Sequence, residues 1–291
     1  MEADRDAAAP NPGLVSRPVA ADWLGFRREA DHRARQSSAH LVDRVSWWLR
    51  ERLSDHDAAV VIDLGAGTGS NQAWLAPRLQ VAQRWILLDH DADLLESSTV
   101  IDAEQVLATT RMVGSVDQLP QLMPDHGPAL VTCAALLDLL SAREIALIAE
   151  TISSSQAAAV LSLTVTGEVS LTPSDPEDQA IAAAFDAHQR RGDLLGPEAA
   201  ETLTAQLRDR GMPVEVVQTD WLLDASRAEF VERYLSDRAH AAAEFDPTLS
   251  QAAQQWLQRR VQQLRRGELS VRVGHHDVVC VPDAPAAAPA G

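Results

Sequence analysis

Short apolar runs alternate with segments of helical spacing along most of the chain. The apolar runs lie within residues 60–64, 84–89, 109–119, 128–140 and 157–167. Strands that are buried on both faces read as nearly continuous apolar runs, and helices between them supply the crossovers of a parallel sheet. The pattern therefore predicts an α/β fold built on a doubly wound, mostly parallel sheet.

The C-terminal part of the chain extends this sheet. A helix is predicted over 197–210, followed by the strand "PVEVVQTDWLL", a helical insert over about 227–266 and the strand "LSVRVGHHDVVCV". Turn residues at 211–213 and Gly267 allow these last two strands to pair antiparallel at one edge. We expect seven strands, with an antiparallel edge strand and the helical insert before the last strand.

The domain limits follow from the same pattern. Residues 21–56 carry two apolar stripes at helical spacing and are predicted to form an N-terminal helical cap with a bend near 36–38. The sheet domain is expected over 57–282, with inserts at about 168–196 and 225–267.

The two ends and the charge narrow the class of protein. Residues 1–20 and 283–291 are predicted to be disordered tails, and the first of them lacks the apolar core of a secretory signal. The net charge is −17 and all 25 cationic residues are arginine, which disfavours nucleic acid and membrane partners. Cys133 and Cys280 have no metal or CxxC spacing, so we expect two free thiols in a cytoplasmic protein.

The end of the first strand carries the strongest functional pattern. Gly65, Gly67 and Gly69 stand at alternate positions after Asp63 and lead into a helix. Glycine permits positive φ and a close ligand, and a helix N-terminus favours negative charge. A ligand is therefore expected across this turn. The third glycine comes only four residues after the first, unlike the dinucleotide pattern GxGxxG.

Together with Asp63, the stretch "DLGAGTGSN" resembles motif I of the class I S-adenosylmethionine-dependent methyltransferases. The resemblance covers about residues 60–167 by motif and the remaining strands by order. It implies a Rossmann-like fold, S-adenosylmethionine as cofactor, S-adenosylhomocysteine as product, and methyl transfer by in-line displacement. "WLGFRREADHRAR", "FDAHQRRGDLLGP" and "VGHHDVV" look more loosely like actinobacterial small-molecule methyltransferases whose substrates are unassigned.

The resemblance also implies a set of cofactor ligands. Asp89 closes the second strand about 20 residues after the turn, where a carboxylate accepts hydrogen bonds from both ribose hydroxyls. The family often has an aspartate after the third strand that contacts the adenine; here Ser115 takes that place, with Asp117 two residues later. The full expected set is Asp63, Gly65, Ala66, Gly67, Gly69, Asp89, His90, Ser115, Val116, Asp117, Cys133 and Arg35.

Candidate acceptor contacts lie on elements that we expect to cover the turn. Arg28 and Arg35 are seven apart with Asp31 between them, so they share a helix face and are available to a carboxylate, or else form solvated i,i+4 pairs. Arg190 is a second candidate for a carboxylate or phosphate on the acceptor. Leu137 lies in the segment that leads into the substrate pocket.

Two titratable groups are candidate catalytic residues. His188 has an ordinary pKa that suits a base near neutrality, although a lone histidine on an alanine-rich helix is often a surface residue. Asp138 follows the fourth strand, where substrate contacts are made, or serves as a helix cap. No metal site is expected, because adjacent histidines such as His275 and His276 point to opposite faces of a strand.

Two other functions compete with methyl transfer to a small molecule. An NAD(P)-dependent oxidoreductase would also use Asp89 on a ribose, but the glycine spacing and the absence of lysine for a Tyr-x-x-x-Lys pair oppose it. A non-catalytic cofactor-binding protein of the same fold would keep the turn without turnover. A nucleic acid acceptor is disfavoured by charge and by the missing N-P-P-Y signature. The oligomeric state stays open, a homodimer included.

Overall fold

The computed structural model describes residues 21–54, 57–99, 101, 103–189 and 192–283. The tail predicted over 1–20, all but the first residue of the tail predicted over 283–291, and Arg190 lie outside these residues.

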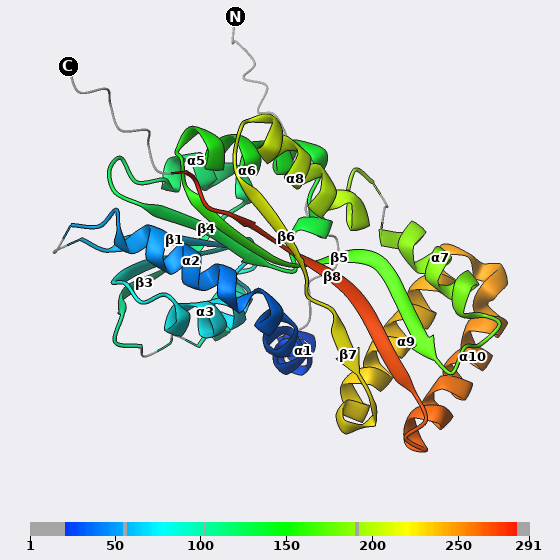
Figure 1. The fold of residues 1–291 in the computed structure, drawn as a ribbon. Coiled ribbons are helices and arrows are strands. Elements are labelled where there is room, and N and C mark those ends of the chain that lie inside the picture. Colours follow the sequence, from blue (N-terminus) through cyan, green and yellow to red (C-terminus); the bar gives the residue numbers. More distant parts are fainter. Residues whose placement is uncertain (1–20, 55–56, 100, 102, 190–191, 284–291) are drawn as a thin grey trace, which may run out of the picture.

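A mixed eight-stranded sheet forms the centre of the fold, in the order β3-β2-β1-β4-β5-β8-β6, with β7 also paired to β8 (Figure 1). The neighbours from β3 to β5 pair parallel, whereas β8 runs antiparallel to β5, β6 and β7. The doubly wound, mostly parallel sheet is therefore confirmed, and β8 lies one position inside the edge strand β6. The strands are β1 Ala59–Leu64, β2 Gln83–Asp89, β3 Val106–Val113, β4 Ala129–Ala134, β5 Ala158–Thr172, β6 Val214–Gln218, β7 Trp221–Leu223 and β8 Ser270–Cys280.

Helices cover both faces of the sheet. They are α1 Ala21–Ala34, α2 Ala39–Arg50, α3 Ser70–Leu75, α4 Ala92–Ser97, α5 Leu119–Leu122, α6 Ala142–Ser154, α7 Asp178–Gln189, α8 Ala199–Asp209, α9 Ala228–Phe245 and α10 Ser250–Arg265. A 3-10 turn over Arg35–Ser38 separates α1 from α2, at the predicted bend. None of the described helices has both the length and the apolarity that crossing a membrane requires.

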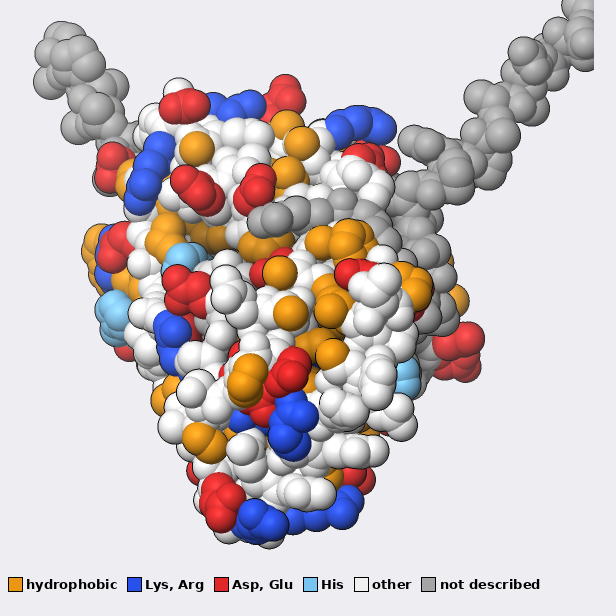
Figure 2. Space-filling model, turned by 90° about the vertical axis from the view of Figure 1, so that its right-hand side faces the viewer, with side chains coloured by type: hydrophobic (Ala, Val, Ile, Leu, Met, Phe, Trp, Pro, Cys, Tyr) orange, Lys and Arg blue, Asp and Glu red, His pale blue; other side chains and the backbone are white. Residues whose placement is uncertain are grey.

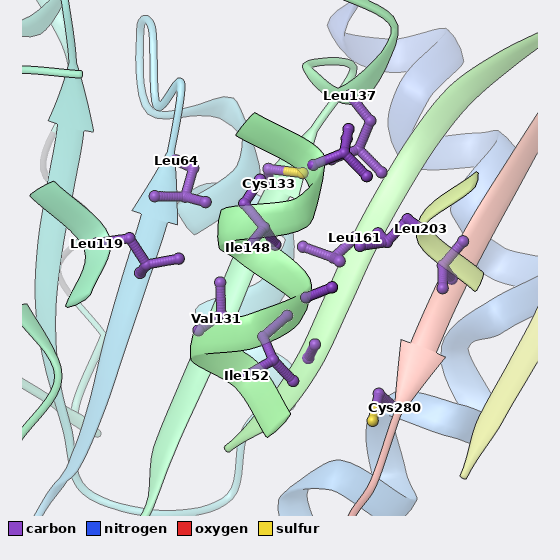
Figure 3. Packing of buried hydrophobic residues seen from close by; sticks show 14 of the residues in the cluster. Leu64, Leu119, Val131, Cys133, Leu137, Ile148, Ile152, Leu161, Leu203 and Cys280 are labelled. Carbon is purple, nitrogen blue, oxygen red and sulfur yellow. The ribbon is translucent and has the colours of Figure 1, made fainter. Parts of the chain in front are cut away.

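Alternating side chains of the parallel strands pack into two different cores. Ile62 and Leu64 of β1 face a cluster with α6 and α8, where Ile148 and Leu203 contribute (Figure 3). Val61 faces the opposite cluster with α2 and α3. Successive side chains of a strand point to opposite faces of the sheet, so the position of a residue in β1 decides which core it enters.

A third core lies at one end of the sheet. β5 continues through residues 168–172, past its predicted end at Gly167, and β8 stays paired with it over this length. The predicted insert at 168–196 therefore begins with strand residues. The extension carries α7, α9 and α10, which pack around Phe230, Leu235 and Trp256. Figure 1 shows these helices beside the extended β5 and β8, away from α2 and α3.

Candidate active site

A cavity of about 1180 Å³ opens where β1, β2 and β4 end and continues along β5 and β8 to α7 and α9. The chain leaves β1 for β2 on one side and reaches β4 on the other, so the cavity begins at the topological switch point of the sheet, where open α/β sheets bind ligands. α1 contributes a further wall through Trp23, Leu24 and Arg27.

The glycine turn after β1 lines this cavity through Gly65, Ala66 and Gly67. The φ angles of Gly65 and Gly67 are 61° and 50°, a region that other residues seldom adopt. A Cβ on Gly65 would lie 2.8 Å from Leu136 Cδ1, and one on Gly67 would lie 3.2 Å from Leu24 Cδ1. The turn therefore keeps its shape only with glycine, under side chains from α1 and from the segment after β4.

Gly69 differs from its two partners. It caps α3 with a φ of 81°, and a Cβ there would meet the Thr99 carbonyl oxygen at 3.3 Å. It does not line the cavity. Gly69 was expected to contact the cofactor. It lies against the Thr99 backbone instead, because α3 begins at the next residue.

Asp89 at the end of β2 is held rigidly against the turn. Its Oδ2 accepts a hydrogen bond from Gly67 N at 2.7 Å, and its Oδ1 accepts one from Asp91 N at 2.9 Å. His90 Nδ1 lies 3.3 Å from Oδ1, and both side chains line the cavity. Each carboxylate oxygen has a second lone pair, so Asp89 can accept further hydrogen bonds from a diol without moving.

The residues after β3 form the next part of the wall. Ser115 and Val116 line the cavity, as predicted for the adenine site. Asp117 does not: its carboxylate is half exposed and lies 3.4 Å from Arg143 Nη2. Asp117 therefore lies outside the cavity, in the 3-10 turn Val116–Gln118 with its side chain exposed to solvent.

Asp63 is placed beneath the cavity rather than in its wall. It shares a face of β1 with Val61, and Oδ1 accepts a hydrogen bond from Asn71 Nδ2 at 2.6 Å. Burial raises the pKa of Asp63 to about 7. Asn71 Oδ1 in turn accepts a hydrogen bond from Arg35 Nη1 at 2.9 Å. Direct cofactor contact by Asp63 is thus not what the structure shows; it orients Asn71 and, through it, Arg35.

Arg35 is a buried cation in the cavity wall. Its side chain is 1% exposed, and its guanidinium lies 3.9 Å from the centroid of the Trp74 ring. Nε and Nη2 have no hydrogen-bond partner among the described residues. Two donors of a rigid guanidinium fork are therefore available to an anion, which fits the prediction that Arg35 contacts the ligand.

Arg28, which we expected on the same helix face as Arg35, does not lie on that face. Arg28 is exposed and lies outside the cavity, whereas Arg27 and Asp31 line it. Asp31 Oδ2 accepts from Arg27 Nε at 2.8 Å, and its Oδ1 accepts from Trp221 Nε1 at 3.0 Å. Asp31 thus joins α1 to β7, and steps of four residues, not seven, mark the inner face of α1.

Two residues predicted to contact ligands at the end of β4 and after it lie outside the cavity. Cys133 and Leu137 are fully buried in the cluster under α6 and do not line the cavity (Figure 3). Ala134, Ala135 and Leu136 line it instead. Ala135 adopts a φ of 55°, unusual for a residue with a side chain, so the backbone is bent out of the strand where the cavity begins.

Both candidate catalytic residues lie in the cavity wall. Asp138 Oδ1 is buried without a hydrogen-bond partner among the described residues, and burial raises the pKa of this carboxyl to about 6. His188 on α7 is 7% exposed, with Nε2 3.7 Å from Glu244 Oε2. Neither position tests a catalytic role.

The last strand contributes residues that the sequence did not assign to the site. His275 lines the cavity with its ring centroid 4.6 Å from that of Trp221, and burial lowers its pKa to about 4. Asp277 is fully buried; it accepts hydrogen bonds from Leu163 N, Thr219 Oγ1 and Ser38 Oγ. Asp277 of the "HHDVV" stretch therefore satisfies polar groups inside the sheet.

Sequence reasoning missed the contribution of α9. Tyr234, Arg238 and Ala241 line the cavity at steps of four and three residues. The signal was available, since Arg238 shares its helix face with Tyr234, Leu235, Ala241 and Ala242, a face that is otherwise apolar or aromatic. Among the described residues, no trio of His, Cys, Asp or Glu is arranged to hold a metal ion.

No protein-family profile and no curated protein matches this sequence. Solved structures do share its fold. A cyclopropane-fatty-acyl-phospholipid synthase-like protein from Lactobacillus casei ATCC 334 is 13% identical, with a TM-score of 0.51, over 92% of this chain and 96% of that one.

Two further structures are those of S-adenosylmethionine-dependent methyltransferases in complex with S-adenosyl-L-homocysteine. The protein from Geobacter sulfurreducens is 17% identical over 84% of this chain and 91% of its own, with a TM-score of 0.40. The protein from Thiobacillus denitrificans is 17% identical over 90% and 99%, with a TM-score of 0.40. At this level of identity, the similarity to the Lactobacillus casei protein shows a shared Rossmann-like fold.

Proposed function

We propose that this protein is an S-adenosylmethionine-dependent methyltransferase that acts on a small molecule. The observation that carries the proposal is the joint geometry of the glycine turn and Asp89. The Asp89 carboxylate hydrogen-bonds Gly67 N at 2.7 Å while facing the cavity at the switch point of the sheet. A ribose whose two hydroxyls meet this carboxylate would place the rest of the cofactor along the turn.

The residues present fit the remaining parts of S-adenosylmethionine. Ser115 and Val116 provide a polar contact and an apolar flank for the adenine. The unpartnered Nε and Nη2 of Arg35 are suited to the carboxylate of the methionine moiety. The glycine turn leaves space that a side chain would occupy.

The cofactor, when bound, supplies an activated methyl group. The chain's own task is then to align an acceptor with it, exclude water and accept a proton where the acceptor carries one. Asp138 suits the last task, because a carboxyl with a pKa of about 6 is ionised and basic near neutrality. His188 lines the same cavity and is a second proton acceptor.

The surface supports a small-molecule acceptor. The net charge is −17, and on the face that carries α7 and α10 the acidic and arginine side chains are interspersed among hydrophobic ones (Figure 2). No single-sign basic patch marks the described residues of this face, and the net negative charge repels a phosphate backbone. Cys133 and Cys280 are buried free thiols, which supports a cytoplasmic location. An actinobacterial origin remains a proposal from the sequence resemblance alone.

The proposal is tested by calorimetric titration with S-adenosylmethionine, S-adenosylhomocysteine and NAD in parallel. We expect the two sulfur-containing nucleosides to bind and NAD not to bind. Asp89→Asn should weaken their binding by about tenfold or more, because an amide cannot accept from both Gly67 N and the ribose as the carboxylate does. The matched control is Asp93→Asn, an exposed acid in the first turn of α4, which should bind as the wild type does.

Binding of NAD with no affinity for S-adenosylmethionine would overturn the proposal in favour of an oxidoreductase. Turnover is measured separately, as S-adenosylhomocysteine formed from S-adenosylmethionine in the presence of a small-metabolite extract. Tight binding with no product formation would identify a non-catalytic cofactor-binding protein.

A further inference from the structure

Arg238 is a buried cation in the part of the cavity that α7 and α9 line. It projects from α9 toward α7, is 4% exposed, and lines the cavity. Its Cζ lies 4.1 Å from the centroid of the Phe185 ring, and its Nη1 donates a hydrogen bond to Tyr234 Oη at 3.1 Å. The guanidinium is therefore fixed on one side by an aromatic face and on another by a hydroxyl.

The same guanidinium has donors left over. Nη2 is buried without a hydrogen-bond partner, and Tyr234 Oη is the one hydrogen-bond partner of Arg238 within the described ranges. Tyr234 accepts that bond and keeps its own proton, because burial raises the pKa of its hydroxyl. Arg238 and Tyr234 thus present N–H and O–H donors, and Arg238 offers no acceptor.

A buried charge without its hydrogen bonds is unfavourable by several kcal/mol in proteins. Two carboxylates that line this half of the cavity pair with other arginines, Asp237 with Arg233 and Glu168 with Arg272. The buried Nη2 of Arg238 is therefore available to an anion that enters from the cavity.

Apolar side chains separate Arg238 from the glycine turn. Phe185 and Tyr234 stand beside it, and Trp221, Val165, Val169 and Val273 line the floor toward β5 and β8. A ligand that reaches from Arg238 toward the cofactor end would lie along these rings and branched side chains. Burying such apolar surface away from water lowers the free energy by about 25 cal/mol per Å².

We propose that the methyl acceptor is an anion with an apolar or aromatic body, whose carboxylate or phosphate is bound by Arg238 and Tyr234. The body lies against Phe185 and Trp221, and the nucleophile points toward Asp138 and the cofactor end. Calling the ligand a methyl acceptor rests on the proposed function. The anion site itself rests only on the surroundings of Arg238.

The test uses three probes of one shape: phenylacetate, phenyl phosphate and the neutral phenylacetamide. Each is titrated calorimetrically into the wild-type protein, with and without saturating S-adenosylhomocysteine. An anion should bind at least about tenfold more tightly than the amide, since hydrogen bonds to charged groups are worth roughly 1.5–3 kcal/mol. The tighter of phenylacetate and phenyl phosphate identifies the anionic group.

Arg238→Gln should remove the preference for the anion, and Tyr234→Phe should reduce it less. Arg265→Gln is the matched control, because Arg265 is an exposed arginine on α10 outside the cavity. Unchanged affinity for S-adenosylhomocysteine shows that each variant is folded. If Arg238→Gln fails this check, Tyr234→Phe decides, and an anion preference there equal to that of the wild type overturns the proposal.

Three further results overturn it: an amide that binds as tightly as the anions, no binding of either anion, or an anion preference that survives in Arg238→Gln. These outcomes are distinct from failure of the methyltransferase proposal. In that case S-adenosylmethionine does not bind, while the anion preference is still measured without cofactor.

Discussion

At the scale of single residues, Asp138 is a carboxyl whose burial opposes its ionisation. Its folded pKa of about 6 lies above the ordinary value of 3.8. The stability that its protonated form contributes is fully present below pH 3.8 and is lost as the pH rises through 6. The site therefore retains an ionisable group at a cost in stability, which is typical of functional positions.

Asp138→Asn should stabilise the protein at neutral pH by about 2 to 3 kcal/mol, because the amide is never ionised. The difference should disappear as the pH falls to roughly 4, where the wild-type carboxyl is also neutral. Urea unfolding across this range measures it. Asp209→Asn, at an exposed position on α8, serves as control and should show no such trend. Equal stability of wild type and Asp138→Asn at neutral pH would contradict the prediction.

Residues whose position is fixed by the end of a strand could be predicted from the sequence. Gly65, Gly67 and Asp89 lie where the strand pattern placed them, since a strand end fixes both the turn and the carboxylate. Arg28 could not be distinguished from Arg27 in this way. One residue turns a helix by 100°, and which side of α1 faces inward is decided by the contact of Asp31 with Trp221, from a distant segment.

At the scale of elements, Asp277 joins three separate segments. Its carboxylate accepts hydrogen bonds from Ser38 Oγ at 2.7 Å, Leu163 N at 2.8 Å and Thr219 Oγ1 at 2.9 Å. Ser38 belongs to the turn between α1 and α2, Leu163 to an irregular point in β5, and Thr219 to the link between β6 and β7. One buried side chain therefore fixes how the cap meets the sheet.

Asp277→Ala should destabilise the fold by about 3 kcal/mol or more, because it leaves buried donors unsatisfied. Ser38→Ala removes a single bond to Asp277 and should cost about 1 kcal/mol. Both are measured by urea unfolding, with Asp209→Ala on the surface as the comparison. If Asp277→Ala lowers the free energy of unfolding no more than Ser38→Ala does, Asp277 does not hold the three segments together.

The elements themselves were largely predictable, and their extents were less so. Apolar runs placed β1, β2, β4 and the start of β5, which are buried on both faces. The more exposed β3 begins at Val106, three residues before its predicted start. The end of β5 was missed: residues 168–172 alternate between exposed and half-buried positions, and only pairing with β8 makes them a strand. Long-range pairing of this kind leaves little trace in local sequence.

At the scale of the whole molecule, α1 touches both halves of the cavity. Leu24 lies over Gly67 at the cofactor end, and the Trp23 ring lies 5.4 Å from that of Phe230 on α9. Asp31 binds Trp221 on β7. Contacts between α1 and each half place this helix in a position to respond when either half is filled.

Saturating S-adenosylhomocysteine should slow amide hydrogen exchange in α1, because a ligand under Leu24 restrains the helix. α10 is the internal reference, since none of its described residues lines the cavity. Exchange is followed by mass spectrometry of peptides from the two helices. Equal protection of both, or of neither, would show that α1 does not respond to the ligand.

The packing of α7 against α9 could not be predicted from the sequence. Phe185 and Arg238 are far apart along the chain and are brought together only by the way the insert folds back onto the extended β5 and β8. Periodicity indicated the helices, but which faces would enclose a cavity depends on that packing.

The uninterrupted run of β5 and β8 from the central sheet to the distal helices has an evolutionary consequence. The proposed donor site lies at the ends of β1 and β2 in the central sheet, whereas α7, α9 and α10 pack on the extension of β5 and β8. Related proteins can therefore differ in the distal helices, and so in specificity, while they keep the same glycine turn and Asp89.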